Sequence, residues 1–417
     1  GIDVEGARAV IGGTNQGNFV AGSTSGGIYL TLPASHPVIQ GNLIGPSPLG
    51  SVVLGNAGIG VRVEAPGAVI GGPTATARNV ISGNGSHGLY IGPAGTGAVI
   101  VGNYVGVLAD GLALASNGWD GIRVEAPGAL IGGTNPAMRN VVAGNLGGVV
   151  ILPTGTNAVI QGNFIGVNAA GTGIVSNRAH GISIQAPGAL IGGGATTNTR
   201  NVVSGNMVNG IEILAGAHGA TIQGNYIGLD VSGALPFSNR QYGVYIDQAN
   251  NVVVGGTGAA RNVIGASRLD GIAVVGTSTN TLIIGNYIGT WAAGTNAIPN
   301  GGGGVAVRAH GVTIGGTQAG FRNLISGNDS GVVVETGRLA RIIGNYIGTR
   351  FDGTGEIPNY FGIRLRQPSH NAIIQSNVIA RNTTIDIFLE NSRGGHDILG
   401  NYIGLQEFGV PLSLIHI

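Results

Sequence analysis

The chain has 417 residues, of which 82 are glycine, 43% are hydrophobic and only 9% are charged. A net charge of +1 lacks the basic excess with which proteins bind nucleic acid or anionic membranes. The absence of cysteine excludes disulfides and thiolate metal sites. No apolar run is long enough to span a membrane, and the regularly placed hydrophobic residues are untypical of a disordered chain.

The expected elements are short strands. Within one representative stretch they lie at residues 121–125, 129–133 and 140–144, where apolar residues alternate with small or polar ones. Alternation with a period of two is typical of a half-buried strand. Sustained 3.6-residue periodicity is absent, and the frequent glycines disfavour helices.

Two motifs recur from one end of the chain to the other. Gly-Asn-Tyr-Ile-Gly, or a close relative, begins at Gly41, Gly102, Gly162, Gly224, Gly285, Gly344 and Gly400. Arg-Asn-Val-Ile-Ser-Gly-Asn, or a relative, begins at Arg78, Arg139, Arg200, Arg261 and Arg322. The period of about 60 residues therefore comprises two coils, and one of them carries about a dozen extra residues.

Stacked coils of this kind predict an all-β solenoid of about 14 coils with loop insertions in alternate coils. Each strand would pair in parallel with its copy in the next coil, about 4.8 Å away, around a core of Val, Ile and Leu. The motifs resemble those of the right-handed parallel β-helix repeat proteins of the pectate-lyase-like superfamily, particularly bacterial secreted or cell-surface members. The resemblance covers residues 1–411 and implies a single-stranded right-handed parallel β-helix and an extracellular or cell-surface location.

We expect residues 1–411 to form one β-helix domain that is truncated at both ends, because the chain starts inside a repeat without a visible signal peptide. Residues 412–417 break the repeat and are expected to be a non-native tail. Since no polar cap is visible, the fragment should self-associate end to end.

The repeated asparagine is expected to be structural. The resemblance implies that it forms an inward-facing ladder at a corner, where each amide bonds backbone and the asparagines of adjacent coils. The positions are Asn18, Asn42, Asn79, Asn103, Asn140, Asn163, Asn201, Asn225, Asn262, Asn286, Asn323, Asn345, Asn377 and Asn401.

The extra residues of the long coils should stack as a ridge of loops at one corner. They occupy residues 46–57, 107–120, 167–180, 229–242, 290–303 and 349–361. The ridge contains the candidate ligand-binding residues Trp119, Asp120, Arg178, His180, Phe237, Arg240, Tyr242, Trp291, Tyr360 and Phe361. Exposed aromatic rings beside forked donors suit sugar rings or another protein. Alternatively, the rings only hold the loops against the solenoid wall.

Two outward-facing columns follow from counting along the first strand of each coil. One column alternates Tyr29, Arg62, Tyr90 and Arg123, which suits cation–π stacking. The other contains an Arg308, Glu335 and Arg366 ladder, which we expect to be a solvated face with weak ion pairs.

Catalytic patterns are weak. Polysaccharide cleavage requires carboxylates close together on neighbouring coils, yet Glu64 and Glu125 are separated by Gly92 in the coil between them. The best dyad is His87 with Asp120, and a histidine beside a surface aspartate is more often structural than catalytic. We therefore expect no catalytic residues, no metal site and no cofactor.

Three functions remain open. The first is a non-catalytic extracellular or cell-surface β-solenoid, an adhesin, stalk or passenger, whose loop ridge binds polysaccharide or a surface protein. The second is a carbohydrate-active enzyme of the lyase, hydrolase or epimerase kind, and the third is a purely structural rod. The scarcity of paired carboxylates favours the first and third, and the aromatic residues favour the first. Nucleic acid and membrane insertion are not expected.

Overall fold

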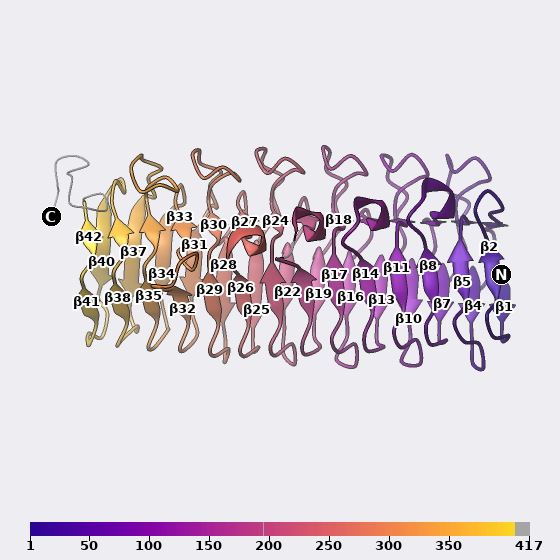
Figure 1. Ribbon diagram of the computed structural model, residues 1–417, viewed down its shortest axis with the longest axis horizontal. Coiled ribbons are helices and arrows are strands. Elements are labelled where there is room, and N and C mark those ends of the chain that lie inside the picture. The colour runs from indigo at the N-terminus through magenta and orange to yellow at the C-terminus, as the bar shows by residue number, and fades with distance from the viewer. Residues whose placement is uncertain (195, 405–417) are drawn as a thin grey trace. The chain divides into compact units, whose positions relative to one another are not determined.

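The computed structural model describes residues 1–194 and 196–404. The chain divides into two compact units, unit 1 at residues 1–208 and unit 2 from residue 209 onward. The same coil recurs within each unit (Figure 1). The tail expected at residues 412–417 lies outside the described residues.

Each coil of unit 1 contributes one strand to each of three parallel sheets, which we call A, B and C. Sheet A contains β1 (Ile2–Val4), β4 (Ile28–Leu30), β7 (Val61–Val63), β10 (Leu89–Ile91), β13 (Ile122–Val124), β16 (Val149–Ile151) and β19 (Ile182–Ile184). Sheet B contains β2 (Val10–Gly12), β5 (Val38–Gln40), β8 (Val69–Gly71), β11 (Val99–Val101), β14 (Leu130–Gly132), β17 (Val159–Gln161) and β20 (Leu190–Gly192). Sheet C contains β3 (Phe19–Val20), β6 (Leu43–Ile44), β9 (Val80–Ile81), β12 (Tyr104–Val105), β15 (Val141–Val142), β18 (Phe164–Ile165) and β21 (Val202–Val203).

Unit 2 repeats this arrangement. Its sheet A contains β22 (Ile211–Ile213), β25 (Val244–Asp247), β28 (Ile272–Val275), β31 (Gly303–Val307), β34 (Ser330–Val334), β37 (Phe361–Arg366) and β40 (Ile385–Glu390). Its sheet B contains β23 (Thr221–Gln223), β26 (Val253–Gly255), β29 (Leu282–Ile284), β32 (Thr313–Gly315), β35 (Arg341–Ile343), β38 (Ile373–Gln375) and β41 (Asp397–Leu399). Its sheet C contains β24 (Tyr226–Ile227), β27 (Val263–Ile264), β30 (Tyr287–Ile288), β33 (Leu324–Ile325), β36 (Tyr346–Ile347), β39 (Val378–Ile379) and β42 (Tyr402–Ile403).

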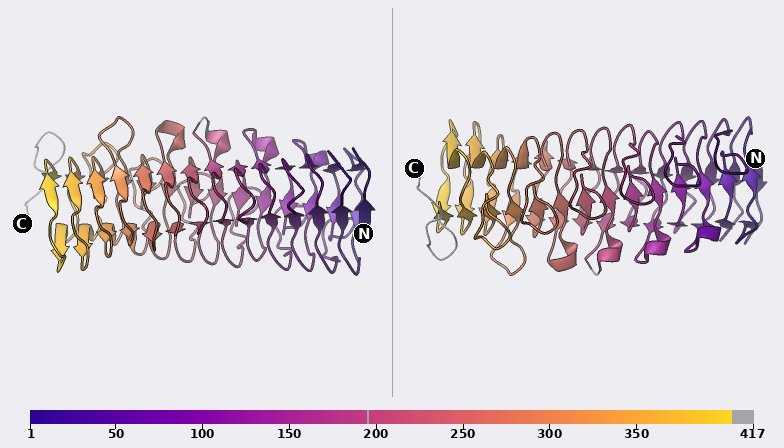
Figure 2. Two further views of the ribbon diagram at one scale, coloured as in Figure 1. Left: turned by 90° about the horizontal axis from the view of Figure 1, so that it is seen from below. Right: turned by 90° about the horizontal axis from the view of Figure 1, so that it is seen from above.

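Helical structure in the described residues is limited to four single 3-10 turns. They are η1 (Ala75–Ala77), η2 (Pro136–Met138), η3 (Thr197–Thr199) and η4 (Gly258–Ala260), and Figure 2 shows them along one edge of the unit to which each belongs. Each turn follows sheet B and ends at the arginine of the Arg-Asn motif. The predicted fold, a right-handed parallel β-helix of about 14 coils, is confirmed.

The core consists of aliphatic columns that run from coil to coil. In sheet B of unit 1, Ile70, Ile100, Ile131 and Ile160 pair in register and are fully buried. Each of these side chains removes its apolar surface from water, which stabilises the fold by roughly 1.5–3 kcal/mol per side chain. The period-2 pattern places the intervening residues on the outer face of the sheet, where they do not contribute to the core.

The predicted asparagine ladder is present at the corner before sheet C. In unit 1 the backbone N and Nδ2 of Asn79 both donate to Oδ1 of Asn103, and Asn103 donates to Asn140 in the same way. The same two bonds recur from Asn18 to Asn201 in unit 1 and from Asn225 to Asn401 in unit 2. Most of these asparagines are completely buried, so the ladder satisfies polar groups that water cannot reach.

A second asparagine ladder, which the motifs alone did not predict, lies at the corner before sheet A. In unit 1 it runs from Asn56 through Asn84, Asn117, Asn145 and Asn177 to Asn206 by Nδ2-to-Oδ1 bonds. In unit 2 Ser267 replaces one asparagine and donates its backbone N–H to Asn300. Each coil thus enters sheet A from a fixed, buried corner.

The loops of the long coils stack on one another within each unit, as predicted. In unit 1 the Ala109 N–H donates to Gly50 O at 3.1 Å and the Ala169 N–H donates to Gly111 O at 2.9 Å. Figure 1 shows these loops along one side of unit 1. The loop at residues 107–120 rests on Tyr104 of sheet C, because a Cβ atom at Gly111 would lie only 2.7 Å from Tyr104 Cε2.

Candidate functional site

The outer face of sheet A in unit 1 gathers aromatic and charged side chains from successive coils. The flanking residues Leu89 and Ile91 of β10 are fully buried, so the intervening Tyr90 points outward. Parallel pairing sets Tyr90 between Arg62 of β7 and Arg123 of β13. The Arg62 guanidinium carbon lies 5.4 Å from the centroid of the Tyr90 ring, which is cation–π distance.

Three rings meet at the entrance to this face. The Trp119 ring, from the segment that leads into β13, is 56% exposed and lies edge-on to His87 at 5.7 Å between centroids. The His87 ring is in turn stacked with Tyr90 at 6.2 Å. We call His87, Tyr90 and Trp119 the aromatic cluster, and its exposed tryptophan has the character of a stacking platform.

Carboxylates and guanidinium groups alternate beside the aromatic cluster. Arg62 Nη2 lies 2.8 Å from Glu64 Oε1, and Arg123 Nη1 lies 3.2 Å from Asp120 Oδ2. The Glu125 carboxylate is more loosely paired, at 4.0 Å from Arg123 Nε. These groups combine hydrogen-bond acceptors with forked donors on one face, which suits a ligand with many hydroxyl groups.

His87 and Asp120 lie close together, but the hydrogen bond at His87 Nδ1 is not the one that a general base needs. His87 Nδ1 lies 3.4 Å from Asp120 Oδ2, yet the same Nδ1 accepts the Asp120 backbone N–H at 3.2 Å. The His87 proton is therefore on Nε2, so Asp120 does not orient the ring as the aspartate of a catalytic triad does.

Other histidines support a structural role for His87. His218, His310 and His396 also accept a backbone N–H of a neighbouring coil through Nδ1, at 3.1, 3.2 and 3.1 Å. Burial above all, assisted by Arg123, lowers the pKa of His87 against the opposing charges of Asp120 and Glu125. The neutral ring is the form that accepts this hydrogen bond.

Three of the four predicted ligand-binding residues of unit 1 fall at or beside the aromatic cluster. Trp119 and Asp120 are part of this face, and Arg178 reaches it by donating from Nη2 to Gly118 O at 3.1 Å. His180 occupies the equivalent of the Asp120 position two coils further on, just before β19.

The predicted residues of unit 2 are distributed over two places. Tyr242 stacks on Tyr245 at 5.1 Å, and Tyr360 meets Phe361 edge-on at 4.9 Å, so both pairs flank sheet A. Trp291 and Phe237 instead belong to the loops and are half-buried, and Arg240 is exposed.

Trp291 is held within its own loop. Its Nε1 donates to Thr295 Oγ1 at 2.8 Å, and its backbone N–H donates to Asn296 O at 3.1 Å. Trp119 follows the second-ladder residue Asn117, whereas Trp291 precedes the turn of its loop. The two tryptophans therefore differ in position within the coil, which sequence proximity to the loops did not reveal.

The expected Arg308 column in unit 2 is a continuous ionic network. Arg308 bonds to Glu335 through Nε and lies 3.2 Å from Asp270 Oδ2. Glu335 also pairs with Arg366 at 3.0 Å. Hydrogen bonds from both arginines hold the pKa of Glu335 below its usual value although burial opposes this, whereas burial raises the pKa of Asp270.

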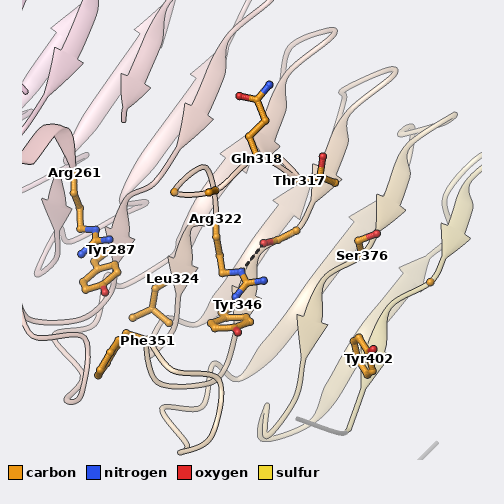
Figure 3. A pocket seen from close by; sticks show the side chains of 15 residues that line it. Arg261, Tyr287, Thr317, Gln318, Arg322, Leu324, Tyr346, Phe351, Ser376 and Tyr402 are labelled. Atoms are coloured by element: carbon orange, nitrogen blue, oxygen red, sulfur yellow. Dashed lines mark hydrogen bonds between the residues drawn. The ribbon is translucent and has the colours of Figure 1, made fainter. Parts of the chain in front are cut away.

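A groove of about 670 Å³ over sheet C of unit 2 is the main alternative site. Figure 3 shows Arg322 flat over Tyr346 in this groove, with its Nε bonded to Gly344 O at 3.2 Å. The guanidinium carbon lies 3.8 Å from the ring centroid, and Arg261 covers Tyr287 at 3.9 Å.

The same stack joins Arg78 to Tyr104 at 4.0 Å and Arg139 to Phe164 at 3.9 Å in unit 1. It explains why the two sequence motifs recur together, since the arginine of one lies on the aromatic ring of the other. Because arginine already covers these rings, the groove offers less stacking surface than the aromatic cluster.

No family model matches the chain, and no curated protein sequence does so significantly. The A-module of a mannuronan C-5 epimerase from Azotobacter vinelandii is a similar structure, with 14% identity, a TM-score of 0.47, and coverage of 98% of this chain and 92% of that one. The chain is a parallel β-helix.

Two further structures resemble this β-helix. The Dettilon tailspike protein has 16% identity and a TM-score of 0.43 over 93% of this chain and 60% of the tailspike. DFA-IIIase from Arthrobacter chlorophenolicus A6 has 11% identity and a TM-score of 0.42 over 81% of this chain and 83% of the enzyme. The β-helix thus spans less than two thirds of the tailspike, and at these identities the likeness concerns the fold alone.

Proposed function

We propose that the protein is a non-catalytic, extracellular or cell-surface β-helix that binds polysaccharide on the outer face of sheet A. The observation that carries the proposal is the aromatic cluster, where an exposed tryptophan stands beside alternating guanidinium and carboxylate groups from successive coils. A sugar ring stacks on such a platform through its C–H face, while its hydroxyls bond the neighbouring charged groups. No helix among the described residues is long and apolar enough to cross a membrane.

We also propose that this face is not catalytic, because the carboxylates and the histidine nearest to the aromatic cluster are already engaged in other interactions. Asp120 and Glu64 are each held by a guanidinium group, and His87 Nδ1 is occupied by a backbone N–H. A general acid or base needs a proton or a lone pair that is free to reach the bond to be cleaved. The residues of this face are therefore better suited to holding a sugar chain than to cleaving it.

The test is binding of the purified protein to a panel of soluble and insoluble polysaccharides, with product analysis for cleavage. Trp119→Ala should weaken binding at least about tenfold, because it removes the exposed stacking surface. Trp291→Ala is the matched control and should bind normally, since Trp291 is engaged within its own loop.

Thermal unfolding separates the outcomes of this test. The Trp119→Ala protein should melt close to the wild type, because an exposed ring contributes little to stability. Binding by Trp119→Ala that equals the wild type would overturn the proposed site. Release of sugar fragments by the wild-type protein would overturn the non-catalytic function.

A further inference from the structure

We infer that the face around the aromatic cluster of unit 1 selects an uncharged, hydroxyl-rich polysaccharide and discriminates against polyuronates. The inference rests on the glycan-binding function proposed above and adds the charge class of the ligand. It depends on three observations: the matched charges of the face, the neutral state of its histidine, and the position of the Glu64 carboxylate.

The guanidinium groups of this face are matched by carboxylates. Arg62 donates to Glu64 from Nη2 at 2.8 Å and from Nε at 3.2 Å. Arg123 donates to Asp120 at 3.2 Å and lies 4.0 Å from Glu125. A polyanion is recognised by guanidinium or ammonium groups in excess of local acids, and this arrangement supplies no such excess.

The charge count of the face gives the same result. Arg178, which bonds Gly118 O beside Trp119, is the third guanidinium of the face. The carboxylates are those of Glu64, Asp120 and Glu125, so three positive charges less three negative charges leave zero. His87 adds nothing at neutral pH, because its Nδ1 accepts a backbone N–H and the ring stays neutral.

The carboxylate of Glu64 is directed toward the next coil. A Cβ atom at Gly92 would collide with both carboxylate oxygens of Glu64, so the glycine provides the space that the carboxylate occupies. Glu64 therefore approaches the coil that carries Tyr90. Burial first, then the charge and hydrogen bond of Glu125 and the charge of Glu64, raise the pKa of the Tyr90 hydroxyl.

Two carboxylates thus act on the same phenol at the centre of the aromatic cluster. Their oxygens are acceptors for the hydroxyl groups of a sugar stacked nearby. A uronate residue in the same place would present its own carboxylate to them, and like charges in close contact disfavour binding. The ligand that fits this face therefore donates hydrogen bonds and carries no negative charge.

The experiment compares binding of the same polysaccharide with and without its carboxylate charges. Dissociation constants are measured for polygalacturonate, for the same polymer fully methyl-esterified, and for a soluble β-glucan, each at low and high salt. An uncharged polymer should bind at least about tenfold more tightly than polygalacturonate at low salt, with an affinity that changes little with salt. Equal or tighter binding of polygalacturonate would overturn the inference.

Two variants locate the effect. Glu125→Gln should improve binding of polygalacturonate several-fold, because it removes the loosely paired carboxylate. Glu5→Gln is the matched control, since Glu5 is an exposed glutamate in the equivalent column of the first coil, and it should have no effect. An unchanged affinity of Glu125→Gln for polygalacturonate would count against the inference. If no polysaccharide binds, the glycan-binding function itself fails, which is a different result from a preference for polyuronate.

Discussion

Replacement of Asn103 by leucine should destabilise unit 1 because this residue sits in the middle of the first asparagine ladder. Its Oδ1 accepts the backbone N–H and Nδ2 of Asn79, and its Nδ2 donates to Ile70 O, Val101 O and Asn140 Oδ1. Leucine has the same branching and the same number of side-chain heavy atoms as asparagine and is larger, so the substitution leaves no cavity and the cost worked out here arises from stranded polar groups. Each buried group left without a partner costs about 1–3 kcal/mol.

The Asn79 backbone N–H loses its acceptor outright, while Asn79 Nδ2 keeps Ile39 O at 2.8 Å. Allowing for a second stranded group and partial relaxation, we expect Asn103→Leu to lower the free energy of unfolding by about 2–4 kcal/mol.

The two tryptophans allow the free energy of unfolding to be measured for unit 1 alone. Trp119 lies in unit 1 and Trp291 in unit 2, so a Trp291→Phe background leaves fluorescence that reports on unit 1 alone. Guanidinium denaturation then compares Asn103→Leu with Asn198→Leu, a substitution of an exposed asparagine in the same unit. Equal midpoints for the two variants would refute the role of the ladder.

Two further substitutions in unit 1 test single interactions by the same fluorescence assay. Arg139→Lys keeps the charge but loses the flat stack on Phe164 and the Nε bond to Gly162 O, so it should cost about 1–2 kcal/mol; an unchanged midpoint would show that the stack contributes nothing. The pKa of His87 is lower in the folded state than in the unfolded chain, so the unfolded chain binds the proton first as pH falls. The stability that neutral His87 contributes is therefore present above the unfolded pKa of about 6.5 and is lost below it. His87→Asn retains an acceptor for the Asp120 N–H and should reduce this loss of stability between pH 7.5 and 5.5; an unaltered pH profile would assign the effect to other groups.

The repeat period predicted the coil and its three strands, and the resemblance to parallel β-helix proteins implied that the recurring asparagine forms a ladder. This was possible because stacking places equivalent residues of successive coils in direct contact. The repeat in the sequence therefore indicates which residues are neighbours in the structure. The stacked loops followed for the same reason, since insertions at one position of every second coil must fall at one corner.

The second ladder was not predicted, because only alternate members belong to a motif: Asn145 ends the motif that begins at Arg139, whereas Asn117 lies in the loop segment of a long coil. Asn117 and Asn145 precede β13 and β16 by different numbers of residues in segments that vary from coil to coil. The recurring asparagine shortly before each opening glycine was the available signal. The stack of Arg139 on Phe164 was also missed, although both belong to motifs, because the period shows which coils touch and not which side chains cover one another.

By itself, the sequence determined the fold and the identity of the outward residues of sheet A, since alternation within a strand assigns each residue to one face. Only the tertiary structure decided how those side chains lie along that face. Glu64 leans over Gly92, His87 takes a backbone N–H from Asp120, and Trp119 remains exposed whereas Trp291 is bonded within its loop. The physical reason is that side-chain direction depends on the space and partners offered by the adjacent coil, which a one-dimensional period does not encode.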